Sequence, residues 1–306
     1  MLNQDWCSWG WLPPDHYPVH QRSSRRGKYR GAVDDHETAT VVQHYETYRE
    51  EDRFSTGLGE LELLRTQEIL LRHLPPAPAR LLDVGGATGA HAQWLVAAGY
   101  AVHIVDLTPR HVEKALVDLG PMGVTAEVGD ARELTASSKS YDGVLLLGPM
   151  YHLTTRSDRI QSLREASRVV RTHGVVAVAA ISRFASLCDG LARGFFFDPR
   201  FRKIVERDLA EGQHRNPENV PRWFTTAYFH EPQQLQSEIE DAGMQVRELV
   251  GVEGPAGCMK HLVERWDTPE DREAILYAAR AVESEPSIIG MSGHLLAIGE
   301  PNLTRS

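Results

Sequence analysis

The chain has 306 residues, of which 42% are hydrophobic and 25% charged, and it carries a net charge of −9 with a pI near 5.9. This acidic balance argues against nucleic acid as the main partner, and no apolar run reaches the length of a membrane-spanning helix. The three cysteines (Cys7, Cys188 and Cys258) lie far apart in the sequence, which favours a reducing compartment over a disulfide framework or a zinc site. We therefore expect a cytoplasmic protein with neither a metal site nor a membrane partner.

The first 32 residues differ from the rest of the chain. Tryptophan and proline are frequent before a basic stretch over residues 22–30, and neither helical nor strand periodicity is visible. This composition predicts a disordered or loosely packed tail over residues 1–32. Two alternatives remain open, a basic arm that binds nucleic acid and a hydrophobic plug for a partner subunit.

Two helices are predicted before the first strand. Apolar residues recur at three- and four-residue steps from Asp34 and again over residues 58–74. The Leu-Pro-Pro-Ala-Pro stretch at 74–78 ends the second helix, because proline cannot continue it. Residues 33–78 are thus expected to form a helical cap on a domain that spans residues 33–306. Tyr45 and Tyr48 either face a ligand under this cap or only pack the cap onto the core.

The segment Leu81–Ala90 is the most informative part of the chain. A short apolar run ends in an acid, Asp83, and the glycine-rich bend from Gly85 to Gly89 follows. Glycine permits positive φ and lets the backbone approach a ligand closely, so the pattern predicts a buried parallel strand that runs into a tight, ligand-binding turn. A helix over residues 91–98 and a second strand over 101–105, ending in Asp106, complete a βαβ unit suited to a ligand with ribose hydroxyls.

Two further strand ends carry similar signals. Residues 124–131 predict a third strand followed by a Gly-Asp-Ala turn that contains Asp130 and Ala131, and residues 141–153 predict a fourth strand with a loop after it. A carboxylate can accept an N–H group, and the backbone amide beside it can donate to a ring nitrogen. Taken singly, Asp106 could also cap a helix, and Asp130 could be a plain turn residue.

The second half of the chain continues the alternation of helices and strands. The expected elements are a helix over 156–171 that stops at His173-Gly174, a fifth strand over 175–181, a helix over 231–243, strands over 245–252 and 294–298, and a helical insert over 253–290. An insertion over residues 182–229 is rich in phenylalanine. It is predicted to be either a mobile lid that closes an apolar pocket or a small satellite core. The ligand-binding core then spans residues 79–181, and the C-terminal part of the sheet spans 230–306.

The pattern Asp83-x-Gly85-x-Ala87-x-Gly89, with the strand ends that follow it, resembles the signature of class I S-adenosylmethionine-dependent methyltransferases of the small-molecule, bacterial type. Ala87 stands where that family usually has its middle glycine. The resemblance implies an α/β, Rossmann-like fold with a seven-stranded, mostly parallel sheet, helices on both faces and an antiparallel last strand. It also implies S-adenosyl-L-methionine as the cofactor, with these residues binding it: Asp83, Gly85, Gly86, Ala87, Gly89, Asp106, Leu107, Asp130, Ala131, Gly148 and Met150.

The same resemblance suggests roles for several side chains. Asp106 would bind the ribose hydroxyls, and Asp130 with Ala131 would bind the adenine. Arg65, on the second predicted helix, would either pair with the methionine carboxylate or be an ordinary surface arginine.

Three residues are candidates for catalysis. His152 is the first candidate for a general base, because a neutral imidazole can take a proton near pH 7, although it could instead cap a helix or pack behind the cofactor. Tyr151 is expected to stack on the substrate or hydrogen-bond to it, and His230 is a second candidate base. The loop 148–153 lacks the Asn/Asp-Pro-Pro-Tyr/Phe motif of adenine methyltransferases, which points away from base methylation.

The function expected from these observations is methyl transfer to the oxygen, nitrogen or carbon of a small-molecule acceptor, by a monomer or homodimer that does not bind nucleic acid. Two alternatives stay open. One is an RNA- or protein-directed methyltransferase with the basic tail as its docking arm, and the other is a non-catalytic protein that binds S-adenosylmethionine. A nicotinamide dehydrogenase is a more distant alternative, because Gly85, Gly86 and Gly89 fit the dinucleotide glycine spacing badly.

Overall fold

The computed structural model describes residues 36–47, 53–55, 57–220, 222–259 and 261–302. The predicted tail over residues 1–32 lies outside these ranges, as does Tyr48. Within them, no helix has the length and apolar character needed to cross a membrane.

A mostly parallel sheet forms the centre of the domain. Its strands are β1 (Arg80–Val84), β2 (Ala101–Asp106), β3 (Thr125–Val128), β4 (Tyr141–Leu146), β5 (Val170–Ser182), β6 (Gln213–His214), β7 (Ala227–His230), β8 (Met244–Gly251) and β9 (His294–Pro301). They run in the order β3-β2-β1-β4-β5-β7-β6, and β9 pairs with both β5 and β8. The seven predicted strands are all present, and β6 and β7, which were not predicted, come from the insertion after β5.

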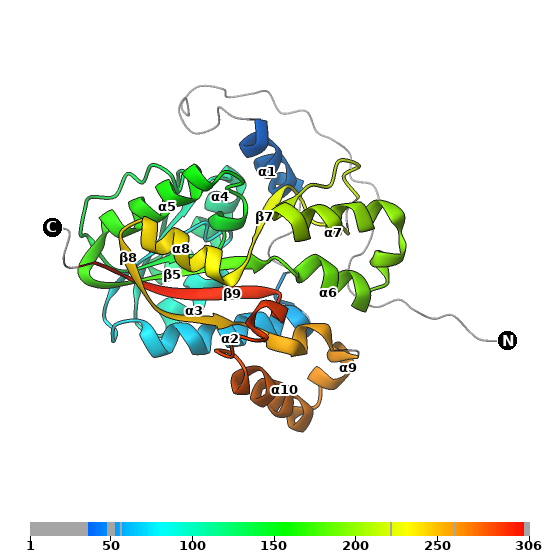
Figure 1. Ribbon diagram of the computed structural model, residues 1–306. Coiled ribbons are helices and arrows are strands. Elements are labelled where there is room, and N and C mark those ends of the chain that lie inside the picture. The colour runs from blue at the N-terminus through cyan, green and yellow to red at the C-terminus, as the bar shows by residue number, and fades with distance from the viewer. Residues whose placement is uncertain (1–35, 48–52, 56, 221, 260, 303–306) are drawn as a thin grey trace. The chain divides into compact units, whose positions relative to one another are not determined.

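Helices cover both faces of this sheet, as predicted. The α-helices are α1 (His36–Thr47), α2 (Gly57–His73), α3 (Ala90–Ala97), α4 (Pro109–Leu119), α5 (Arg156–Val169), α6 (Ala185–Ala192), α7 (Pro199–Glu211), α8 (Pro232–Asp241), α9 (Leu262–Trp266) and α10 (Pro269–Ala281). In Figure 1, α5 and α8 lie on one face of the sheet and α2 and α3 on the other. Short 3-10 helices include η3 (Pro149–Tyr151), η4 (Phe195–Phe197) and η5 (Gly254–Cys258).

Alternation along the strands explains how two apolar cores form. Side chains of successive strand residues point to opposite faces of a sheet. Val144 and Leu146 of β4 therefore pack in the core formed with α5 and α8, whereas Leu145 packs in the core formed with α2, α3 and α4. Both faces of β4 are buried from Gly143 to Leu146, which requires a sequence without polar side chains there.

The strand order reverses between the parallel neighbours β1 and β4. From β1 the chain continues outward to β2 and β3 on one side, and from β4 it continues to β5 on the other side. In an open α/β sheet this reversal leaves a crevice outside the carboxyl ends of the two strands. The predicted ligand-binding turn after β1 and the loop after β4 therefore meet at one place.

The last strand is antiparallel, as expected. Because β9 runs against β5 and pairs His294 with Ile181, its first residue lies at the carboxyl edge of the parallel strands. A residue at the start of β9 thus faces the same crevice as residues that follow β1 and β4.

Some predicted boundaries were wrong. The helix α5 ends at Val169, and β5 starts at once, so His173 and Gly174 lie inside a strand and are not a helix stop. The helix α4 was not predicted at all.

Cys188 and Cys258, although distant in sequence, are hydrogen-bonded free thiols, and this contact lowers the pKa of Cys188 to about 7.

The insertion over residues 182–229 forms α6, η4, α7, β6 and β7. Four of its aromatic side chains, Phe195, Phe196, Phe201 and Trp223, pack in a small core. Phe224 is different, because its ring stacks on His152 with a centroid distance of 5.9 Å. The insertion therefore holds a satellite core, and Phe224 packs against the pocket residues Tyr151 and His152.

Candidate functional site

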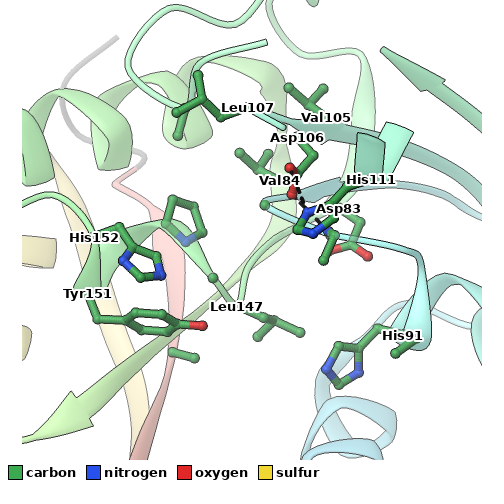
Figure 2. A pocket seen from close by; sticks show the side chains of 18 of the residues that line it. Asp83, Val84, His91, Val105, Asp106, Leu107, His111, Leu147, Tyr151 and His152 are labelled. Atoms are coloured by element: carbon green, nitrogen blue, oxygen red, sulfur yellow. Dashed lines mark hydrogen bonds and ion pairs between the residues drawn. The ribbon is translucent and has the colours of Figure 1, made fainter. Parts of the chain in front are cut away.

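A pocket lies at the carboxyl ends of the parallel strands, where the strand order reverses. Its wall includes the turn after β1, the ends of β2 and β3, the loop after β4, and residues of α1, α2 and β9. Figure 2 shows Asp83, Asp106 and His111 on one side of this pocket and Tyr151 and His152 on the opposite side.

The turn after β1 approaches the neighbouring loop so closely that glycine is required at Gly85. The residue has φ +71°, and a Cβ atom there would lie 2.7 Å from Cδ of Pro149. A Cβ atom on Gly86 would lie 2.6 Å from Oδ2 of Asp83. At Gly85 and Gly86 the backbone itself therefore forms the pocket wall, and Ala87 and Thr88 of the same turn line the pocket beside it.

Asp83 lies in the pocket wall, and its carboxylate receives no hydrogen bond from the described residues. The residue is fully buried. Burial and the nearby carboxylate of Asp106 raise the pKa of Asp83 to about 7. A buried acceptor without a donor is costly unless a ligand supplies one, so this position fits a cationic ligand group.

Asp106 binds the pocket backbone and retains accepting capacity. Its Oδ2 accepts the amide hydrogen of Ala87 at 2.9 Å, and its Oδ1 accepts that of Thr108 at 2.9 Å and contacts Nδ1 of His111 at 3.2 Å. Ala87, with φ +48°, is thus held in the left-handed region by this bond. A carboxylate offers about four lone-pair positions, so Asp106 can also accept from hydroxyls of a ligand.

We expect Asp106→Ala to weaken binding of S-adenosylmethionine by about 1–3 kcal/mol, because a charged acceptor is lost and the two loop amides lose their partner. Calorimetric titration measures this change. Asp118→Ala removes an exposed aspartate of α4 that pairs with Lys114 and serves as the control. An unchanged dissociation constant for Asp106→Ala would rule out contact between this carboxylate and the cofactor.

The predicted turn after β3 also lies in the pocket wall, with Gly129, Asp130 and Ala131. The carboxylate of Asp130 is paired with Arg132, whose Nη2 donates to Oδ2 at 2.7 Å. Leu107 and Gly148 line the pocket too. Gly89 does not, because it is the N-cap of α3 behind the turn.

Tyr151 and His152 both line the pocket on the side opposite Asp83. Nε2 of His152 is hydrogen-bonded to the Tyr45 hydroxyl at 2.9 Å, so Tyr45 faces the pocket under the cap. Burial lowers the pKa of His152 to about 3. This imidazole is therefore neutral and already hydrogen-bonded, which makes it a weak proton acceptor.

Besides Gly89, three residues expected at the site lie elsewhere. His230 is fully buried on β7 and contacts Oε2 of Glu238 at 3.2 Å, so it does not reach the pocket. Met150 packs in the core beneath the loop after β4. Arg65 is neither a ligand partner nor a surface residue, because it is buried between α2 and the Glu283 carboxylate and donates to the Val252 carbonyl.

One group of charged side chains on the pocket wall was not predicted from the sequence. Arg53, Glu62 and His294 line the pocket, and Glu253 lies directly behind His294. Nη2 of Arg53 donates to Oε1 of Glu62 at 2.6 Å, and Nη1 donates to the Tyr151 hydroxyl at 3.4 Å. These residues come from four separate segments, and none carries a local motif that would have revealed it.

Comparison with known proteins identifies the domain. Residues 81–174 match the family model described as a methyltransferase domain. No curated protein matches the chain by sequence.

Solved structures share the fold at low sequence identity. A S-adenosylmethionine-dependent methyltransferase of Methanosarcina mazei is 15% identical and aligns over 77% of this chain and 97% of its own, with a TM-score of 0.52. A Haloferax volcanii methyltransferase in complex with the Trm112 activator is 17% identical over 89% and 100% of the two chains, with a TM-score of 0.54. A Thermotoga maritima enzyme described as a possible histamine N-methyltransferase is 19% identical over 87% and 99%, with a TM-score of 0.51.

The pocket fits S-adenosylmethionine. The turn leaves backbone facing the ligand, Asp83 offers an unpaired buried acceptor that suits a cationic group, and Asp106 can accept from ribose hydroxyls. The family match over residues 81–174, the strand order and the pocket chemistry agree on a methyltransferase domain that uses S-adenosylmethionine.

Proposed function

We propose that this enzyme transfers the methyl group to a small-molecule acceptor that enters the pocket from solution. The observation that carries this proposal is that the pocket is lined, besides the turns at the strand ends, by Tyr45, Arg53, Phe54, Tyr151 and His152. A pocket lined by aromatic rings and a few polar side chains suits a compact acceptor with an apolar body and a few polar groups.

When bound, S-adenosylmethionine supplies an activated methyl carbon, and the protein supplies orientation and exclusion of water. In our proposal Asp83, the turn 85–87, Asp106 and the turn 129–131 hold the cofactor. Tyr151 and His152 hold the acceptor, with His152 fixing the Tyr45 hydroxyl rather than removing a proton. Whether oxygen, nitrogen or carbon accepts the methyl group depends on the group that binds the acceptor's nucleophile.

Two measurements test this function together. Calorimetry with S-adenosylmethionine and S-adenosylhomocysteine, with NAD as the control, should give micromolar binding of the two sulfur compounds only. Label transfer from methyl-labelled cofactor is then assayed with a panel of phenols, catechols, primary amines, imidazoles, tertiary amines and carboxylates.

The RNA-directed alternative has its own outcome. It predicts label in total RNA instead of in the panel, with RNA binding that weakens steeply as salt rises and that is lost on deletion of residues 1–31. The Haloferax volcanii neighbour bound to Trm112 is the reason to include this arm. Label in RNA and none in the panel would overturn the proposed function.

A further inference from the structure

Glu253 and His294 form a hydrogen-bonded pair in which the carboxylate orients the imidazole ring. Oε1 of Glu253 contacts Nδ1 of His294 at 2.5 Å, and Oε2 accepts the His294 amide hydrogen at 3.0 Å. The Ser292 hydroxyl donates to the same Oε2 at 2.7 Å and accepts the amide hydrogen of Glu253. Glu253 is almost fully buried, so its carboxylate is fixed on three donors and holds the imidazole ring in one orientation.

The second ring nitrogen of His294, Nε2, is not used in these contacts. Within the described part of the chain, Nδ1 carries the contacts to Glu253 and to Glu62, the latter at 3.8 Å, and nothing hydrogen-bonds to Nε2. Nε2 is also not among the enclosed polar atoms without a partner. Because His294 lines the pocket, Nε2 is the atom available to a bound molecule.

The surrounding charges make His294 a better base than His152. Burial lowers the pKa of His294, but the carboxylates of Glu62 and Glu253 outweigh burial and the opposing Arg53 guanidinium, and the pKa is raised above its ordinary 6.5. Burial raises the pKa of Glu253, yet the contacts with His294 and Ser292 hold it at about 2, so its carboxylate stays ionised. Among the residues that the structure describes, no carboxylate pairs with His152, and its Nε2 is hydrogen-bonded to Tyr45.

Glu62, Glu253 and His294 bring three ligand-type atoms within 4.8 Å of one another. The Arg53 guanidinium already pairs with Glu62, and both Glu253 oxygens already accept hydrogen bonds. The cluster is therefore occupied by its own donors and works as a hydrogen-bonded network.

We propose that His294, oriented by Glu253, is the general base of the methyl transfer, and that the acceptor's nucleophile is a protonated O–H or N–H group directed at Nε2. This inference deepens the proposed function and rests on it. The proton passes to Nε2 of His294 while the electron pair of the O–H or N–H bond stays on the nucleophile. That pair forms the new bond to the methyl carbon, and the sulfur keeps the electrons of the broken C–S bond. Glu253 balances the charge of the imidazolium and acts as a positioning residue.

Histidine ring NMR on the S-adenosylhomocysteine complex tests the pair without any acceptor. One histidine should titrate with a midpoint above 6.5, and its signal should be missing in His294→Gln. Glu253→Gln should move that midpoint down. Glu62→Gln should do the same more weakly, and it serves as the second variant if Glu253→Gln does not fold. His73→Gln is the matched control, because His73 contacts Glu248 at 2.6 Å in a similar pair away from the pocket.

The acceptor panel gives the second readout. Transfer to phenols, catechols, primary amines or imidazoles should rise with pH through the His294 midpoint, because only the neutral ring accepts a proton. His294→Gln should lower kcat about a hundredfold, while cofactor affinity stays within about twofold and His73→Gln leaves both unchanged. Glu253→Gln should shift the pH profile together with the NMR midpoint.

The outcomes separate the two hypotheses. Three results would each overturn the role of His294 alone: equal turnover by His294→Gln, transfer restricted to tertiary amines or carboxylates, and a His294 midpoint that does not change in Glu253→Gln. Tight cofactor binding with no methylation of any panel member would overturn the proposed function, and the inference with it.

Discussion

Arg159→Leu is expected to lower the free energy of unfolding by about 3–5 kcal/mol, because the change leaves a charge buried without its partner. Arg159 is 2% exposed and donates to both oxygens of Glu238, at 2.7 and 2.8 Å. It also donates to the carbonyls of Leu153 and Thr154, in the loop that positions Tyr151 and His152. Denaturant unfolding at pH 7 measures the loss, and cofactor binding should weaken in the same variant.

The effect should depend on pH in a defined direction. Burial raises the pKa of Glu238, but the hydrogen bonds from Arg159 and His230 outweigh burial and lower it to about 2. A carboxylate with a depressed folded-state pKa stabilises the fold above its ordinary value and loses that contribution as the pH falls toward the folded value. The difference in unfolding free energy between wild type and Arg159→Leu should therefore shrink between pH 5 and about pH 2.

Arg168→Leu on the same helix is the matched control. Arg168 also holds a glutamate, Glu165, and two backbone carbonyls, but its side chain is 34% exposed. Exposed ion pairs contribute little, so this variant should lose no more than about 1 kcal/mol. Equal losses in both variants would show that burial is not the source of the effect.

Gly85→Ala is expected to weaken cofactor binding at least about a hundredfold. The new Cβ would press on Cδ of Pro149 at 2.7 Å and approach its backbone nitrogen at 3.2 Å, and the residue would keep a φ of +71° that alanine adopts only with strain. The turn after β1 and the loop after β4 would have to move apart, and these are two walls of the cofactor pocket. Calorimetry with S-adenosylhomocysteine measures the loss.

Gly123→Ala separates strain from contact. Gly123 also has positive φ, at +93°, but a Cβ there would meet nothing within 4 Å. This variant should lose about 1 kcal/mol of stability and bind the cofactor as wild type does. If Gly85→Ala behaves like Gly123→Ala, the close approach to Pro149 does not shape the pocket.

The strands and turns of the predicted cofactor pocket could be predicted from the sequence, because their signals lie within short segments. Apolar runs with both faces buried predict parallel strands, and the turns after β1, β2 and β3 each hold their functional groups within a few residues of a strand end. The order of these strand ends was enough to expect Asp83, Asp106, Asp130 and Ala131 around one pocket, and the structure brings them together.

The residues around His294, where we propose that the acceptor reacts, come together only in the tertiary structure. His294 begins a strand, and only the antiparallel pairing of β9 with β5 carries it to the carboxyl edge of the sheet. Arg53 and Glu62 reach the same wall from the cap, and Glu253 from the end of β8. Met150 lies in the same loop as Tyr151 and His152, and His230 ends β7, but both side chains make buried contacts outside the pocket. Sequence alone predicted the residues of the cofactor pocket, because each turn holds its polar groups within a short segment. Our proposal of His294 as the general base required the fold, because a general base is defined by the carboxylate that orients it and by the pocket that its free nitrogen faces.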